Sequence, residues 1–143
     1  MTTNVVNALV DADILIKLSV LDLFAPCLSA VGIAPSECAT LESMRLSAGL
    51  NKLSVREKKA GAGAPANRLL YTLQAIRGLN KIDAAERVLS ARLVSESMRL
   101  GLAVDAGEAM LISLCICRGV PYVTTGDKKA IRSLPALEQG VKE

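Results

Sequence analysis

Two short apolar runs near opposite ends of the chain constrain the fold more than any other feature. Residues 5–10 (VVNALV) lead directly into Asp11, and residues 120–125 (VPYVTT) follow Gly119. Their length and their β-branched residues predict strands, and the first of these strands is expected to be buried. The intervening sequence has apolar residues at helical spacing, as the crossovers between parallel strands require. The sequence therefore predicts a three-layer α/β/α fold, in which helices cover both faces of a central, mainly parallel sheet.

Between the two strands the sequence predicts one further strand and several helices. A helix follows Asp13, whose side chain can cap it. Residues 30–34 (AVGIA) read as a second strand, and Pro35 then opens a helix to about residue 48. Further helices are expected over residues 69–77, 83–100, 105–118 and 127–134, the last of them closed by Pro135. With 143 residues, the chain suits a single domain spanning residues 1–143.

The composition removes several classes of catalytic site. The chain contains no His, which excludes Ser-His and Cys-His nucleophile pairs and His-ligated zinc. Its four Cys form no C-x-x-C pair, so no zinc or thioredoxin-type site is indicated. Aromatic residues make up only 2% of the chain, which disfavours nucleic-acid binding by base stacking. Catalysis must therefore rest on carboxylates, hydroxyls, Lys, Arg or Cys.

Acidic residues stand next to the predicted strands. Asp11 and Asp127 follow the first and last strands, and Glu42 lies on the helix after the second. Asp105 and Glu108 begin the helix that leads into the last strand. In a parallel sheet, residues that follow the strands meet at the carboxyl edge, where ligands bind. Clustered carboxylates repel one another, and Mg²⁺ or Mn²⁺ relieves that repulsion. Such ions support phosphodiester cleavage without His.

Each acid also has a structural interpretation. Asp13 and Asp105 are plausible helix N-caps, and Glu108 can complete a capping box. Glu42 can be an ordinary residue on a helix surface. Asp11 is harder to explain in this way, because it directly follows a buried strand, where an acid needs partners.

Basic residues are concentrated in the middle third of a chain whose formal charge is +3. The cluster consists of Lys52, Arg56, Lys58 and Lys59. It is typical either of a solvated helix face or of a surface that binds the phosphates of RNA.

Two stretches resemble the PIN domain family, which includes the VapC-type toxins of bacterial toxin–antitoxin pairs. Residues 9–18 (LVDADILIKL) are similar to the family's apolar strand, acid and apolar helix. Residues 108–131 (EAMLISLCICRGVPYVTTGDKKAI) are similar to its later acid, helix, strand, Thr and Asp. Residues 33–42 give a weaker third match. The resemblance covers both ends of the chain well and the middle poorly, and it implies a PIN-like fold.

The resemblance also implies a set of metal-binding acids. Position by position, they fall on Asp11, on Glu42 or its competitor Glu37, on Glu108 or Asp105, and on Asp127. A hydroxyl beside the last acid falls on Thr124 or Thr125. Asp13 departs from the family pattern, which more often has Asn, Ser or Thr, and it adds negative charge to the site.

The activity implied by the resemblance is Mg²⁺- or Mn²⁺-dependent cleavage of RNA by an endoribonuclease. The resemblance further implies a homodimer, for which the aliphatic region 69–100 can supply an interface, and an antitoxin protein that occludes the site. No apolar run is long enough to span a membrane and no signal peptide is visible, so the cytoplasm is the expected location.

Three other interpretations compete with this one. A non-catalytic PIN-like binding or scaffold module would fit the substituted acids and the poorly matching middle. A haloacid-dehalogenase-like phosphatase shares a strand followed by Asp-x-Asp, but Leu15 stands where that family has Thr or Val. A receiver domain also places acids after its first strand, but no central phospho-acceptor Asp is evident.

Overall fold

A single parallel sheet organises the protein. The computed structural model describes residues 5–45, 65–102, 104–125 and 128–142. Within them, four strands form the sheet in the order β3-β2-β1-β4, and every pairing is parallel. The strands are β1 (Ala8–Val10), β2 (Cys38–Leu41), β3 (Arg77–Leu79) and β4 (Tyr122–Thr124). The predicted α/β architecture with a parallel sheet is confirmed.

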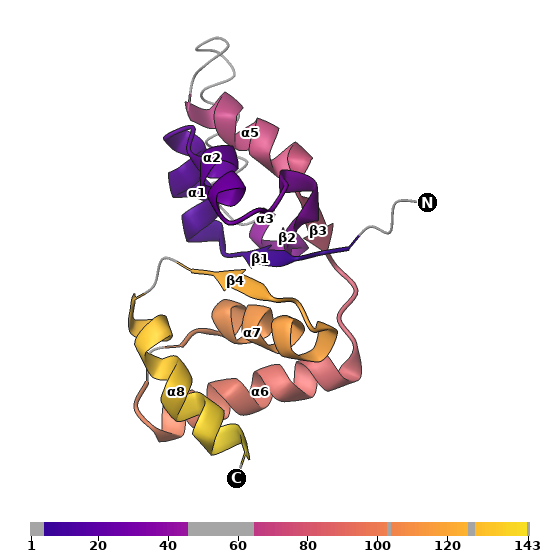
Figure 1. Ribbon diagram of the computed structural model, residues 1–143. Coiled ribbons are helices and arrows are strands. Elements are labelled where there is room, and N and C mark those ends of the chain that lie inside the picture. Colours follow the sequence, from indigo (N-terminus) through magenta and orange to yellow (C-terminus); the bar gives the residue numbers. More distant parts are fainter. Residues whose placement is uncertain (1–4, 46–64, 103, 126–127, 143) are drawn as a thin grey trace.

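Helices lie on both sides of this sheet (Figure 1). One side carries α1 (Ala12–Val20), α2 (Phe24–Ala30) and α5 (Pro65–Ala75). The other carries α7 (Ala106–Arg118), with α6 (Ala84–Arg99) and α8 (Lys128–Lys142) packed beyond it. A 3-10 helix η1 (Pro35–Glu37) and a short helix α3 (Glu42–Arg45) flank β2. None of the described helices is both long and apolar enough to cross a membrane.

Alternation along β1 divides the core between the two sides of the sheet. Ala8 and Val10 belong to a buried cluster with residues of α1, α2 and α5, such as Leu15. Leu9, between them, belongs to a second cluster with Leu111 of α7. Successive side chains of a strand point to opposite faces, so a fully buried strand must be apolar throughout.

The order of the strands fixes where a ligand can bind. The chain proceeds from β1 to β2 and β3 on one side, and then crosses to β4 on the other side of β1. The direction of winding therefore reverses between β1 and β4. In open parallel sheets, ligands bind beyond the carboxyl ends of the strands at such a switch point.

The second strand lies later in the chain than the sequence predicted. The expected strand at residues 30–34 is wrong: Val31 and Gly32 form the turn that ends α2, and Gly32 has a φ of +73°. Pro35 opens only the 3-10 helix η1. The following residues, predicted to be helical, form β2 because Cys38 and Ala39 pair with β1 and are fully buried.

Two other predicted helix ends are also wrong. The helix expected over residues 69–77 ends at Ala75, and the next residues form β3. Pro135 lies inside α8 instead of closing it. A proline in a helix costs about 3 kcal/mol. Beyond it, Leu137 is 1% exposed and packs with α6 and α7, which stabilises the continued helix.

An ion pair joins α6 to α7. The Glu86 side chain of α6 is only 3% exposed. Arg118 donates to both Glu86 oxygens, at 3.1 and 3.0 Å, and to the Lys81 carbonyl at 2.7 Å. The Ser113 hydroxyl donates to the Glu86 carbonyl at 2.6 Å. These bonds fix the position of α7, whose first residues belong to the candidate site.

Candidate functional site

Asp11 stands at the switch point of the sheet. It directly follows β1, and its backbone N–H donates to the carbonyl of Thr124 at 3.0 Å. Its Oδ2 accepts a 3.1 Å hydrogen bond from the hydroxyl of Thr125, which is 114 residues away in the chain. Asp11 is also the N-cap residue of α1, although its side chain makes no capping bond. The prediction that Asp13 caps this helix is therefore wrong.

The surroundings of Asp11 disfavour its charge. Burial raises the pKa of this half-buried carboxyl, whereas hydrogen bonds from Thr125 and from the Ala12 backbone act in the opposite direction. The negative charges of Asp105 and Asp13 add to the increase, so the pKa lies above its usual value. A cation at this position would offset both the burial and the repulsion.

Asp13 itself faces the solvent. Its side chain is 65% exposed and pairs with Lys17 one turn further along α1, at 3.2 Å. Exposed pairs of this kind contribute little to stability. Asp13 therefore influences the site through its charge on Asp11 rather than through the position of its carboxylate.

Asp105 and Glu108 form the predicted capping box at the start of α7. The Asp105 side chain accepts from the Glu108 N–H at 2.8 Å, and the Glu108 side chain accepts from the Asp105 N–H at 3.1 Å. Asp105 is exposed, whereas Glu108 is 6% exposed. Both acids thus have a structural role, and Asp105 in addition exerts its charge on Asp11.

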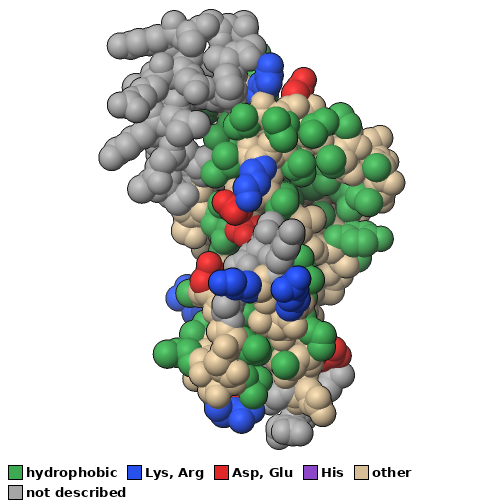
Figure 2. All heavy atoms as spheres, turned by 90° about the vertical axis from the view of Figure 1, so that its left-hand side faces the viewer, with side chains coloured by type: hydrophobic (Ala, Val, Ile, Leu, Met, Phe, Trp, Pro, Cys, Tyr) green, Lys and Arg blue, Asp and Glu red, His purple; other side chains and the backbone are tan. Residues whose placement is uncertain are grey.

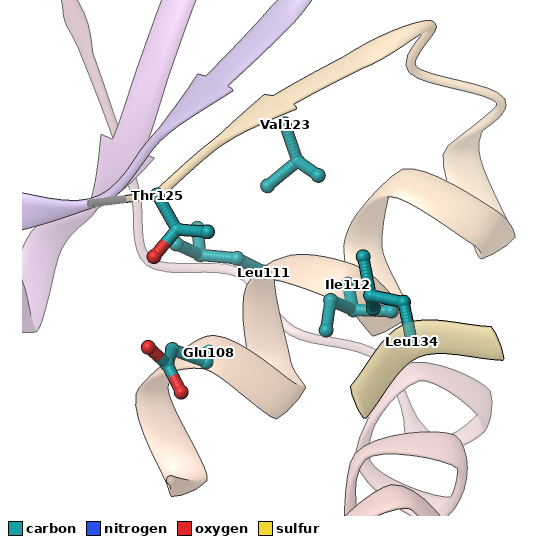
Figure 3. Close-up of a pocket in the computed structure, with 6 residues that line it drawn as sticks. All are labelled: Glu108, Leu111, Ile112, Val123, Thr125 and Leu134. Carbon is teal, nitrogen blue, oxygen red and sulfur yellow. The ribbon is translucent and has the colours of Figure 1, made fainter. Parts of the chain in front are cut away.

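Glu108 and Thr125 line the same small cavity, of about 20 Å³, between β4, α7 and α8. Figure 3 shows the Glu108 carboxylate and the Thr125 hydroxyl at one end and Ile112 and Leu134 at the other. A space of this size can hold about one water molecule. Thr125 therefore bonds to Asp11 and shares the lining of this cavity with Glu108.

Glu42 and Glu37 lie at opposite ends of β2. Glu42 directly follows β2 and lines a groove together with Ala106 and Gly107 at the start of α7. Glu37 precedes β2, and its carboxylate accepts from the Asn7 side chain at 3.1 Å and from the Ala34 N–H. Because the site lies at the carboxyl edge, Glu42 is the better placed of these two candidates.

Several predicted residues lie outside the described part of the chain. They are Asp127 and the basic cluster Lys52, Arg56, Lys58 and Lys59. Thr124, by contrast, is described. Its hydroxyl lies 3.5 Å from the Leu9 carbonyl, and its bond to Asp11 is made by its backbone carbonyl, which accepts from the Asp11 N–H.

Figure 2 looks onto the carboxyl edge of the sheet. Acidic side chains appear at mid-height, between a mainly hydrophobic upper part and basic side chains below. Among the described residues, no three His, Cys, Asp or Glu side chains are grouped closely enough to hold a metal ion. Mg²⁺, however, is often held by one or two carboxylates and several waters. The oxygen donors at Asp11, with the charge of Asp105 nearby, fit that mode of binding.

The sequence missed residues that follow β3. Asn80 stands directly after this strand, at the same edge as Glu42, and lines the same groove. The sequence predicted a helix through Arg77, so a polar residue shortly after it had no apparent meaning. The signal was the short Ile-Arg-Gly-Leu run before Asn80, which is too short to distinguish from a helix end.

Comparisons with known proteins identify no family and no relative. The chain matches no protein-family model, no curated protein and no solved structure.

Proposed function

We propose that the protein is a metal-dependent endoribonuclease that hydrolyses phosphodiester bonds of RNA. The observation that supports this most is the position of Asp11. It lies at the switch point of a parallel sheet, it is held by Thr125, and its pKa is raised by burial and by two neighbouring acids. Carboxyls whose pKa is shifted by burial and by neighbouring charges are candidates for functional sites. The resemblance of residues 9–18 and 108–131 to PIN domains supports the same function.

In this proposal Asp11 is the principal metal ligand. Asp105, Glu108, Glu42 and Asp127 complete the acidic set, either as ligands or through waters. A bound Mg²⁺ or Mn²⁺ would activate water and stabilise the charge that develops on the phosphate. The Thr125 hydroxyl orients the Asp11 carboxylate, and the ion pair between Glu86 and Arg118 fixes the C-terminal end of α7 against α6.

The proposal extends to partners and location. The basic cluster at residues 52–59 would contact phosphates of the RNA. An antitoxin protein would occlude the acids, for instance with an Arg side chain. The protein would act in the cytoplasm as a homodimer, for which the exposed Val88 and Met98 of α6 offer apolar contact area.

The test is cleavage of a labelled RNA panel in Mg²⁺, Mn²⁺ or EDTA, comparing wild type with Asp11→Asn. We expect metal-dependent cutting that the variant loses by at least about a hundredfold, the effect typical of removing a group that stabilises developing charge. Asp22→Asn is the matched control. Asp22 is an exposed acid just beyond the other end of α1, about 14 Å along the helix, and Asn tolerates its φ of +57°.

Two results would contradict the proposal. One is equal cutting by wild type and Asp11→Asn, which would place the activity elsewhere. The other is no cutting of any RNA by folded wild type with either metal. That second result would favour a non-catalytic module that binds RNA or protein, an alternative consistent with the lack of a three-acid group among the described residues.

A further inference from the structure

A groove of about 460 Å³ lies beside the acidic site, at the carboxyl ends of β2 and β3. Its apolar walls are formed by Leu41, Leu79, Ile82 and Met110. Polar groups from Glu42, Ser43 and Asn80 surround its opening. Apolar clefts with a few polar groups at the rim are the usual form of binding sites for small organic groups.

The groove adjoins two acids of the candidate site. Glu42 lines it, and Ala106, which also lines it, is the residue after Asp105. Next to Ala106, α3 and α7 come close together: a Cβ added to Gly107 would lie 3.0 Å from the Met44 Cε. One nucleic-acid strand could therefore place a phosphate at the acids and a neighbouring group in the groove.

The charge of the lining discriminates between the parts of a nucleotide. None of the described residues that line the groove is Lys or Arg. A phosphate would lose its hydration to the apolar walls there without gaining a cation from the lining. An uncharged heterocycle is accepted, because its faces can contact Leu79 and Met110 while its edge bonds to polar groups at the rim.

We propose that this groove binds a single unpaired nucleobase of the RNA, next to the bond that is cut, and that Asn80 reads the edge of that base. The inference rests on the proposed ribonuclease function and specifies its substrate: single-stranded RNA with a preference at one position. Bases are accessible in this way only when unstacked, as in loops and ends of RNA. Asn80 is exposed and its amide carries both donors and an acceptor, as edge recognition requires.

Methionine methyl groups provide a direct test that needs no cleavage. Met110 lines the groove, Met44 lies against Gly107 of its lining, and Met98, 78% exposed on α6, is not one of the lining residues. The full chain, labelled with ¹³C at the methionine methyls, is titrated without metal with each of the four ribonucleoside 5′-monophosphates. Ribose 5-phosphate, which lacks the base, is the matched control ligand.

We expect the nucleotides to shift the Met110 and Met44 signals in a saturable way, without shifting Met98. Ribose 5-phosphate should leave all three unchanged. One base should bind about fivefold more tightly than the weakest, the discrimination that one or two hydrogen bonds supply. Asn80→Ala should reduce that ratio to nearly one. Ala106→Leu, which adds a side chain that the helix tolerates, should weaken binding of every nucleotide.

Three results would overturn the proposal: no shift of Met110 and Met44, equal shifts with ribose 5-phosphate, or equal shifts of Met98. The ribonuclease proposal is judged separately. If wild type cuts RNA and the groove signals do not move, the base site is wrong and the ribonuclease stands. If the signals move as expected and no RNA is cut, the groove still binds bases and the ribonuclease is wrong.

Discussion

The pair between Glu86 and Arg118 gives the sharpest prediction about stability. Arg118→Met keeps much of the side-chain volume but leaves a carboxylate that is 3% exposed without its two charged hydrogen bonds. Removing one partner of a fully buried pair costs about 3–5 kcal/mol. Because the Arg118 side chain is 33% exposed, water can reach part of the gap, and we expect a loss of about 2–3 kcal/mol. For a chain of this length, that lowers the Tm by roughly 10 °C.

Urea unfolding followed by circular dichroism measures the loss, and Arg99→Met is the matched control. Arg99 also pairs with a glutamate, Glu96, and two of its N–H groups donate to the same carboxylate oxygen at 3.0 and 2.7 Å. The Arg99 side chain, however, is 60% exposed. We expect that control to cost less than about 1 kcal/mol. The double variant Glu86→Leu with Arg118→Met should cost less than the sum of its single changes. Equal losses in Arg118→Met and Arg99→Met would refute the reasoning.

Two further predictions concern Asp11. Folding raises the pKa of Asp11, so the folded state favours the protonated carboxyl. The free energy of unfolding therefore falls as the pH rises from the unfolded-state pKa of 3.8 through the raised pKa of the folded state, and it is constant at higher pH. Asp11→Asn should therefore be more stable than wild type at neutral pH, by less than about 1 kcal/mol for a half-buried group. That gain should vanish in acid, and a gain that stays the same in thermal melts down to pH 3 would contradict the burial argument. Thr125→Val removes a hydrogen bond that lowers the same pKa. Its cleavage-against-pH profile should move to higher pH, and a profile that moves to lower pH would show that the hydroxyl does not stabilise the carboxylate.

The parts of the fold that the sequence predicted correctly depend on local signals. Both terminal strands lie in short runs rich in apolar and β-branched residues, and the capping pattern at Asp105 and Glu108 gives the start of α7. Gly119 ends that helix as expected, with a φ of +64°. In each case a few neighbouring residues determine the conformation, so the sequence alone is sufficient.

The errors occurred where distant contacts determine the conformation. Cys38 and Ala39 have no strong preference for strand, and they form β2 because β1 lies beside them. α8 passes through Pro135 because Leu137 is buried beyond it. Glu86 is buried because Arg118, 32 residues later, reaches it. Such pairings follow from the assembled fold, which no local pattern contains.

The candidate site was predicted in outline for the same reason. Asp11 was identified because an acid after a buried strand is conspicuous, and Asp105 and Glu108 because they begin a helix. The hydrogen bond from Thr125 to Asp11 follows from the pairing of β1 with β4, which places the residues after both strands side by side. The groove beside them was missed because it depends on β3.

The pairing of β1 with β4 also has a consequence during protein synthesis. Asp11 leaves the ribosome early, but the hydroxyl that holds its carboxylate comes 114 residues later. The helix that begins with Asp105 is likewise made only after most of the chain. A nascent chain therefore carries Asp11 without its hydrogen-bond partner until Thr125 has been translated. If the proposed ribonuclease function is correct, the site would stay incomplete, and RNA cleavage would be absent, until that point of synthesis.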